Sequence, residues 1–394
     1  MSEPRARALG RDVPMTAVAA TALGALLCAV GLIVDPRRTA AAYLVAYVAC
    51  LSVVLGALAM IMIARVTAAT WFVVLRREAE QVAAVLPALA VLFVPVVAAM
   101  RWLYPWVAAG QLPAGPVRDA ALAKGAYLNV PFFLIRAAAY WAVWLTLTAL
   151  LRRASLREDG GRSAEAEHRT YVASAVGLPL FALATSFAAF DWMMSLDPTW
   201  YSTIYGVSYF AGGMVGAVAL LVLLVIRGRR RGELPEPVGA DHLHALGKLL
   251  LTFLLFWIYI AFSQYIVIWS ADLPVEAEWY VVRTQGAWGA LAAVLIAGHF
   301  AIPFCVLLLR AVKRSAVAMG ALGMLLLVMH YADVYWMVMP DAAQVTAGSV
   351  WMDGAAVLFV GGAASLAWAV RRAGEPTVPR GDPALAASIA YRSD

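Results

Sequence analysis

Charged residues are scarce in this sequence. Asp, Glu, Lys and Arg together make up 14% of the 394 residues, whereas apolar residue types make up 63%, and the mean hydropathy is +0.79. An average soluble domain has roughly 25% charged and about 45–50% apolar residues. The scarcity of charge therefore excludes an ordinary soluble domain and indicates an integral membrane protein.

Cysteine pairs and the common nucleotide and protease motifs are also missing. Cys28, Cys50 and Cys305 lie inside apolar runs and form no CxxC or CxxCH pattern, which disfavours a disulfide framework, an iron–sulfur site and covalent haem attachment. There is no Walker motif, no GxGxxG fingerprint and no HExxH motif, so the usual routes to nucleotide or peptide hydrolysis are absent. Function is therefore expected in the apolar segments and the loops that join them.

Long apolar runs are what the sequence has in abundance. A helix that crosses a hydrocarbon core of about 30 Å takes roughly 20 residues. Ten spans of this kind are predicted, over residues 13–34, 40–64, 82–103, 130–151, 170–190, 203–226, 246–269, 285–309, 316–338 and 350–370. The first run is too long for a signal peptide and is expected to be retained. The sequence thus predicts an all-α, polytopic membrane protein in which residues 1–394 form a single integral membrane domain.

The basic residues are placed unevenly around these spans. Of the 30 lysines and arginines, 23 fall on one side, in the segments 1–12, 65–81, 152–169, 227–248, 310–315 and 371–394. The positive-inside rule places this side in the cytoplasm, so both termini are predicted to be cytoplasmic. Because the net charge of +6 comes from short loops, no nucleic-acid surface is expected. Residues 66–81 mix apolar and basic side chains in the manner of an interfacial helix.

An aspartate stands where the fifth apolar run ends. The segment FDWMMSLDPTWY at 190–201 places Asp191 and Trp192 there. An ionisable group at membrane depth is a candidate functional residue, whereas a solvated helix end followed by an Asp-Pro turn is the structural alternative. Arg136, in the outer part of the fourth run, needs a carboxylate partner at its depth. Asp191 and Asp333 are the two candidates.

A histidine and an aspartate share one face of the ninth run. His330 and Asp333 are three residues apart, which places them on the same side of a helix. A carboxylate beside an imidazole orients the ring and favours its charged form. The pair is therefore predicted to relay protons or to hydrogen-bond a quinone oxygen. A self-satisfied structural pair is the alternative.

His299, on the eighth run, is a second buried histidine that could bind a haem together with His330. With a rise of about 1.5 Å per residue, His299 is predicted about 20 Å below the outer surface and His330 only about 10 Å below it. A haem between two histidines at different depths is disfavoured.

Further polar residues gather in the outer half of the predicted spans, and fewer lie in the inner half. The predicted proton path consists of Asp191, His330, Asp333, Arg136, His299 and Tyr259. The residues of a polar layer that could contact a quinone are Gln264, Tyr265, Arg283, Gln285 and Trp192. No catalytic residue and no metal site is predicted.

Three segments carry a resemblance to a known family. They are DWMMSLDPTWYST at 191–203, FSQYIVIW at 262–269 and HYAD at 330–333. Together they resemble the ActF family of membrane subunits of bacterial alternative complex III, within the NrfD/PsrC-like membrane protein superfamily. The resemblance covers residues from about 170 to 340, and the first four runs add little to it.

The resemblance implies two up-and-down four-helix bundles, formed by spans two to five and six to nine, with flanking helices. It implies a place in the bacterial inner (plasma) membrane, in a complex that oxidises quinol, either menaquinol or ubiquinol, and passes electrons to cytochrome c or to a terminal oxidase. The principal quinol site is expected on an ActC-like paralogue. This chain is therefore expected to supply a proton path or a scaffold, with quinone as a possible contact.

The resemblance also implies partners and their cofactors. Besides the ActC-like paralogue and membrane lipid, these are an iron–sulfur subunit and multihaem and monohaem cytochrome c subunits, which would carry the iron–sulfur clusters and haem c. No cofactor is expected to be covalently bound to this chain.

Two other functions fit the sequence. A secondary transporter would place its site near the midplane, between helices broken by Gly and Pro, whereas the polar residues here crowd the outer half. A membrane anchor of a polysulfide- or DMSO-reductase-type complex would belong to the same superfamily. Genomic neighbours that encode a multihaem cytochrome c and a large iron–sulfur protein would favour the ActF-type subunit, and a molybdopterin subunit would favour the anchor.

Overall fold

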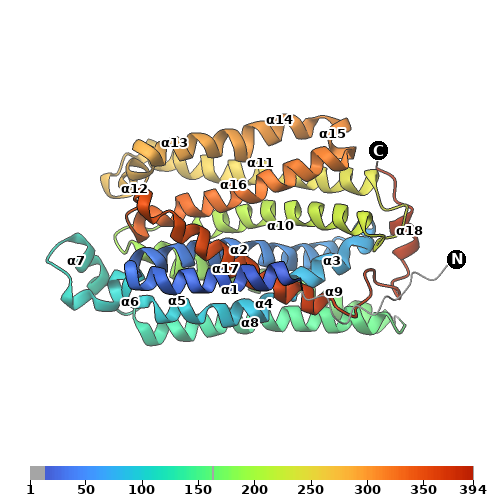
Figure 1. Cartoon of the computed structure of the whole chain (residues 1–394), viewed down its shortest axis with the longest axis horizontal. Helices are drawn as coiled ribbons and strands as arrows, with labels where there is room; N and C mark the ends of the chain where they lie inside the picture. Colours follow the sequence, from blue (N-terminus) through green and yellow to red (C-terminus); the bar gives the residue numbers. More distant parts are fainter. Residues whose placement is uncertain (1–13, 162–163, 394) are drawn as a thin grey trace.

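The computed structural model describes residues 14–161 and 164–393, and the secondary structure of this part of the chain is helical, with no β-strand. Ten of its helical segments are long and apolar enough to cross a membrane. They run side by side, as Figure 1 shows. The predicted all-α, polytopic membrane protein is confirmed. Four of the basic residues on the predicted cytoplasmic side lie outside the described residues: Arg5, Arg7, Arg11 and Arg162.

The spans follow one another along the chain with short connecting helices. The first six are α1 (Met15–Val34), α2 (Pro36–Val66), the broken span of α3 (Val73–Ala83), α4 (Leu86–Leu92) and α5 (Val94–Ala98), then α8 (Val130–Glu158), α9 (Ala164–Trp192) and α10 (Tyr205–Arg230). The last four are α11 (Ala240–Ala271), the span of α13 (Gly286–Leu295) and α14 (Ile302–Leu308), then α16 (Ala316–Ala342) and α17 (Trp351–Arg372). The connecting α-helices are α6 (Met100–Leu103), α7 (Pro116–Ala123), α12 (Pro274–Thr284), α15 (Arg310–Arg314) and α18 (Leu385–Ile389).

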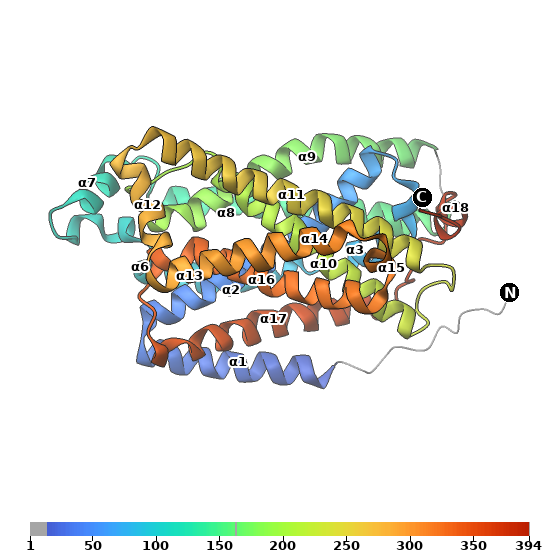
Figure 2. The same cartoon turned by 90° about the horizontal axis from the view of Figure 1, so that it is seen from above.

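Two central helices, α2 and α10, are almost wholly buried and pack against each other. On one side, α2 packs against α3 and α9, and α9 packs against α8. On the other side, α10 packs against α11 and α16, and the eighth span packs against both. These contacts agree with the expected pair of four-helix bundles. The flanking helices α1 and α17 lie side by side along α2, as Figure 2 shows.

Glycines allow the central helices to approach closely. A Cβ added at Gly56 would lie 2.7 Å from the Cβ of Ala217 and 2.7 Å from the carbonyl oxygen of Gly213. A Cβ added at Gly213 would lie 2.8 Å from the carbonyl oxygen of Ser52. Backbone atoms at such distances leave no room for a side chain, so the contact between α2 and α10 requires glycine.

The two ends of the molecule differ in composition. The loops with most arginines and lysines, together with α15, α18 and the start of α3, lie at the right-hand end in Figure 1, which we call the basic end. The opposite end, which we call the aromatic end, holds α7 and α12. There α7 projects beyond the spans.

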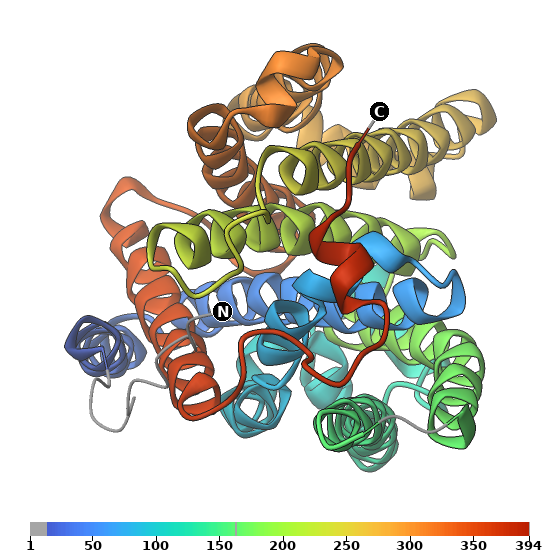
Figure 3. The ribbon, with the colours of Figure 1, turned by 90° about the vertical axis from the view of Figure 1, so that its right-hand side faces the viewer.

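A C-terminal tail, residues 373–393, crosses the basic end, as Figure 3 shows. The Ser388 hydroxyl accepts a hydrogen bond from the Val74 amide (2.9 Å) and donates one to the Trp71 carbonyl (3.0 Å). Further along, the Ser393 amide donates to Asp241 of α11 (3.1 Å). The tail therefore binds to both four-helix bundles.

The third span begins earlier than predicted. The prediction was 82–103, preceded by an interfacial helix, but the structure has one helical span from Thr70 to Ala98. Its first half, α3, buries the polar side chains Arg76, Arg77, Glu78, Glu80 and Gln81. Hydropathy rates each charge as if it stood alone, whereas here Arg77 binds Glu80 (3.1 Å) and Arg76 binds Asp382 (2.7 Å). The prediction of an interfacial helix is wrong.

The close approach of α2 and α10 generates a stability prediction. Gly213→Ala should destabilise the folded protein by about 1–3 kcal/mol, the usual result of overpacking, because its new methyl group would meet the Ser52 carbonyl. Gly354→Ala is a matched control, since nothing lies within 4 Å of the added Cβ. Thermal unfolding of the two variants in detergent measures the difference. A Gly213→Ala variant as stable as wild type would contradict the packing described.

Candidate functional site

Two polar side chains of α16, His330 (2% exposed) and Asp333 (5% exposed), are buried on the face that packs against α10. A Cβ added at Gly212 would lie 3.2 Å from Nδ1 of His330 and 3.0 Å from Oδ2 of Asp333. One added at Gly216 would lie 3.0 Å from Cδ2 of His330. The prediction that His330 and Asp333 share a helix face is confirmed. The two glycines of α10 make the space that the imidazole occupies.

His330 has one satisfied and one unsatisfied ring nitrogen. Its Nε2 lies 2.7 Å from the Ser52 hydroxyl, which donates its own proton to the Ala49 carbonyl at 2.8 Å. A hydroxyl has one proton to donate, so Ser52 accepts from Nε2, and the lone pair of the neutral ring is on Nδ1. Nδ1 is buried and has no hydrogen-bond partner among the described residues. This atom is placed to accept a proton or a ligand donor.

Asp333 is linked to the second buried histidine through an indole. The Nε1 of Trp257 donates to Oδ2 of Asp333 at 3.0 Å. The imidazole of His299 stacks on the same indole, with ring centroids 4.2 Å apart and an interplanar angle of 12°. Both ring nitrogens of His299 are buried without a partner in the described part of the chain. We refer to His299, His330, Asp333 and Trp257 as the central cluster.

His299 lies in an irregular turn of the eighth span. Residues Ile296–Ala301 form a π-helical turn between α13 and α14. Pro303 follows His299 by four residues, and a proline ring clashes with the carbonyl four residues before it in a regular α-helix. This clash explains why the α-helix is interrupted here. Single π-helical turns occur frequently at functional sites.

The predicted difference in depth between the two histidines is wrong. α16 continues to Ala342, beyond the predicted end at 338, so His330 lies 12 residues from the end of its helix, or about 18 Å. His299 lies 13 residues from the start of α13 at Gly286, or about 20 Å. The two histidines are therefore at similar depth. The depth argument against a shared haem fails, and the Trp257 indole occupies the space against one face of His299.

A second buried cluster joins α8 and α9 in the first bundle. Asp191 is 0% exposed and accepts hydrogen bonds from Nε of Arg136 (2.7 Å), Nη2 of Arg136 (3.0 Å) and the Tyr140 hydroxyl (2.7 Å). The expected carboxylate partner of Arg136 is thus Asp191 and not Asp333. A solvated helix end is excluded for Asp191. With both oxygens held by donors, this carboxylate is anchored in an ion pair.

The surroundings of Arg136 strengthen this anchoring. Its guanidinium carbon lies 3.8 Å from the ring centroid of Tyr127 and 4.4 Å from that of Phe132, distances typical of cation–π contacts. Burial and the charge of Asp191 raise the pKa of Tyr127, which lies before α8, to about 12. Tyr127 is therefore neutral at physiological pH.

Trp192 belongs to the aromatic core of the first bundle. Its ring centroid lies 4.4 Å from that of Phe93 and 5.8 Å from that of Trp144, and its carbonyl accepts from the Tyr104 hydroxyl at 3.0 Å. Arg283, at the aromatic end of the second bundle, instead binds Asp341 at 2.5 Å and lies over Trp279. The predicted single polar layer is therefore divided into separate clusters.

Four predicted residues of α11 and its neighbourhood differ in exposure. Tyr259 (65%) and Tyr265 (41%) face outward, and Gln285 is also exposed. This places Tyr259 outside any internal proton path. Gln264 is buried, its amide nitrogen lacks a partner among the described residues, and it lies seven residues beyond Trp257. Seven residues are two helical turns, or about 10 Å, so Gln264 lies on the aromatic side of the central cluster.

A cavity of about 590 Å³ lies between α1, α2, α3, α10, α16 and α17. His330 and Tyr331 line it near the middle of the spans, and Arg227 and Trp368 line it at the basic end. We call it the central cavity. Sequence reasoning missed it because most of its lining residues are ordinary alanines, valines and leucines. Ser52 and Trp257 were missed for a similar reason, since one hydroxyl and one indole in apolar runs stand out only once the packing is known.

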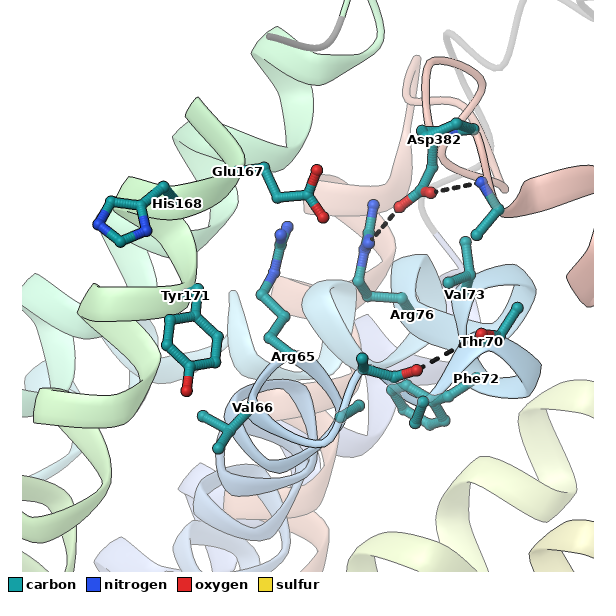
Figure 4. Close-up of a pocket in the computed structure, with 15 residues that line it drawn as sticks. Arg65, Val66, Thr70, Phe72, Val73, Arg76, Glu167, His168, Tyr171 and Asp382 are labelled. Atoms are coloured by element: carbon teal, nitrogen blue, oxygen red, sulfur yellow. Dashed lines mark hydrogen bonds and ion pairs between the residues drawn. The ribbon is translucent and has the colours of Figure 1, made fainter. Parts of the chain in front are cut away.

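A second cavity, of about 500 Å³, lies at the basic end between α2, α3, α9 and the tail, as Figure 4 shows. Two of its arginines are already paired: Arg76 with Asp382 at 2.7 Å, and Arg65 with Glu158 at 3.2 Å. These pairs join the tail and α8 to α2 and α3. We interpret this region as a structural junction and place the candidate site at the central cluster.

Comparisons with known proteins assign no family to this chain. Comparison with models of known protein families finds no match, and comparison with curated proteins finds no relative. The fold and the site define a class only: a multi-pass helical membrane protein with a buried histidine–aspartate cluster beside a cavity.

The ion pair of the first bundle generates a prediction. Arg136→Leu should destabilise the protein by about 3–5 kcal/mol, because Asp191 would remain buried without its charge partner. The double variant Arg136→Leu/Asp191→Leu should recover much of that loss, since it removes both charges. Thermal unfolding of purified protein measures both. If the single variant were as stable as wild type, the ion pair would not hold the first bundle together.

Proposed function

We propose that this chain is a membrane subunit of a quinol-oxidising respiratory complex of the alternative complex III type, and that it carries protons through the central cluster. The protein is a multi-pass membrane protein with ten candidate spans in its described part. The observation that carries the proposal is that His330 is buried and has one ring nitrogen without a hydrogen-bond partner among the described residues. This nitrogen, Nδ1, lies near Asp333.

The chemistry of proton carriage separates the two buried clusters. A proton carrier needs an atom that can accept a proton without first breaking strong bonds. Asp191 has three donors on its two oxygens and is unsuited to this task. His330 has a bare Nδ1, and when this atom takes a proton, the nearby carboxylate of Asp333 can balance the new charge. The Trp257 donor keeps that carboxylate in place.

The surroundings of the central cluster provide a direction for the path. The central cavity extends from His330 to Arg227 at the basic end. Gln264, and beyond it the Arg283–Asp341 pair, lie toward the aromatic end. Under the positive-inside rule the basic end faces the cytoplasm of the bacterial inner membrane. The proposed path therefore takes protons from the cytoplasmic side.

In this proposal the redox centres belong to partner subunits. An ActC-like paralogue would hold the principal quinol site, and iron–sulfur and cytochrome c subunits would dock at the aromatic end, where α7 projects. Partner spans and lipids would cover α1 and the span of α13 and α14, which are the least buried spans.

A secondary transporter is the second candidate. The central cavity favours it, because this cavity reaches the middle of the spans from one end, as a transporter site near the midplane would. A transporter would bind a solute in isolation and would not co-purify with c-type cytochromes.

The proposal is tested on the complex purified through this chain and reconstituted in liposomes. His330→Gln and Asp333→Asn should each lower quinol-driven proton movement by about 100-fold or more, the usual contribution of a positioned proton-transfer group. Tyr259→Phe, at an exposed position, should not change it. Wild-type rates in both cluster variants would reject the proton path. A preparation without iron–sulfur and c-type haem subunits in its mass spectrum would reject the complex.

A further inference from the structure

Glu78 of α3 is a buried carboxylate with one bare oxygen. It is 0% exposed, and its Oε2 accepts from Nη1 of Arg372 at 2.6 Å. Its Oε1 has no hydrogen-bond partner among the described residues. Arg372 also binds Gln81 (2.9 Å) and Glu233 (2.7 Å). The guanidinium is therefore held by other acceptors and does not depend on Glu78 alone.

A neighbouring carboxylate of the same helix shows the contrast. Oε2 of Glu80 lies 3.1 Å from Arg77, and its Oε1 lies 3.3 Å from Arg76. Oε1 of Glu80 also has no hydrogen-bond partner among the described residues, but it lies within ion-pair distance of Arg76. The two carboxylates therefore differ in the arginines that hold them: Glu80 lies between Arg76 and Arg77, whereas Glu78 is bound by Arg372.

Glu78 does not itself line the central cavity, but its neighbours at the basic end do. Val82, one turn further along the same face of α3, lines this cavity, as do Arg227 and Trp368. The guanidinium of Arg372 lies over the ring of Trp368, 5.1 Å from its centroid. A Cβ added at Gly228, next to Arg227 on α10, would lie 3.9 Å from Oε1 of Glu78. The bare oxygen therefore faces the helix that forms one wall of the cavity.

The same helix sets the distance between Glu78 and His330. Gly216 contacts His330 and Gly228 faces Glu78. Twelve residues of α10 separate these glycines, which is about 18 Å along the helix axis. Leu220, Leu224 and Arg227, which lie on successive turns between or beside them, line the cavity. At roughly 30 Å³ per water molecule, its volume of about 590 Å³ has room for a chain of waters over this distance.

We propose that Glu78 exchanges protons between the basic end and the central cavity, and so loads the path to His330. This inference rests on the proposed function. The Glu78 carboxylate takes a proton from water at the basic end and becomes a neutral acid. It then releases the proton to water in the cavity and returns to the carboxylate, and the water chain delivers one proton to the imidazole of His330. No other bond is formed or broken.

The charges that face Glu78 allow this exchange. They are Arg372 from α17, Arg227 from α10 and Glu233 from the loop after α10, with the neutral Gln81 beside them. Glu233 is partly exposed and binds both Arg227 (3.1 Å) and Arg372 (2.7 Å). When Glu78 is neutral, Glu233 still balances Arg372. A proton from the surrounding water reaches Glu78 past this partly exposed group.

The test measures proton uptake from the basic side in the reconstituted complex, with a pH-sensitive dye on that side. Glu78→Gln should slow proton uptake per assembled complex by about tenfold or more, which is below the usual rate contribution of a proton-transfer group. Glu78→Asp keeps a carboxylate and should retain part of the rate. Glu80→Gln is the matched control. It should lower thermal stability, because it weakens two ion pairs, but it should leave uptake per assembled complex at the wild-type rate. Wild-type uptake in Glu78→Gln would overturn the proposal.

The variant His330→Gln, measured in the same assay, tests the proton path separately from the role of Glu78. If His330→Gln stops uptake and Glu78→Gln does not, Glu78 is not the loading group, although the proton path stands. If neither variant changes uptake, both proposals fail. Should Glu78→Gln fail to assemble, Glu78→Asp and Leu224→Trp decide the matter. The tryptophan adds volume to the central cavity, which Leu224 lines, at a position that itself forms no ion pair. Wild-type uptake in both variants would overturn the proposal.

Discussion

A charge inside a bilayer must be neutralised by a partner, and the architecture of this protein follows from where those partners lie. Arg136 on α8 and Asp191 on α9 fix the relative position of two spans. Arg38 on α2 and Asp353 on α17 attach a flanking helix to the centre. Each of these pairs joins spans that are distinct in the chain. The scarce charges of an apolar sequence thus specify which helices become neighbours.

Buried polar atoms that have no partner are informative for the same reason. A buried polar atom without a partner costs about 1–3 kcal/mol, so a fold retains such atoms against its own stability. Nδ1 of His330, both ring nitrogens of His299 and Oε1 of Glu78 are atoms of this kind. His330 and Glu78 border the central cavity or its walls, whereas the fully paired Asp191 lies in the other bundle. Other unsatisfied atoms in the described part of the chain, such as Nη1 of Arg38 and Oδ1 of Asp353, belong to ion pairs that hold helices together. Position beside the central cavity is what sets His330 and Glu78 apart.

The sequence predicted those features that depend on local pattern. Ten apolar runs gave ten spans because the length of a run reflects bilayer thickness, and a three-residue spacing placed His330 and Asp333 on one face. The need of Arg136 for a carboxylate was also apparent, although the choice of Asp191 required the packing of α8 against α9. Helix length beyond the apolar run was not predictable, and the four extra residues of α16 were enough to invalidate the predicted depth of His330.

Features that depend on mutual compensation escaped prediction. The charged start of the third span is buried because its side chains form ion pairs with α8, α17 and the tail. A hydropathy value for one segment does not include partners from other segments. Tyr259 was assigned to the proton path and Tyr265 to the polar layer from their depth along α11, but their rotation around that helix places both on its exposed surface. The central cavity is formed by the gaps between six helices, and no single segment encodes it.

The C-terminal tail gives the molecule a fixed base. Ser388 bonds to the start of the third span and Ser393 bonds to the start of α11, so one short strap ties the two bundles together at the basic end. Bundles that rock against each other to expose a site alternately to the two sides must change their separation at both ends. A strap of this kind resists such a motion. It leaves undisturbed the small rearrangements by which a proton moves along waters and side chains in a rigid frame.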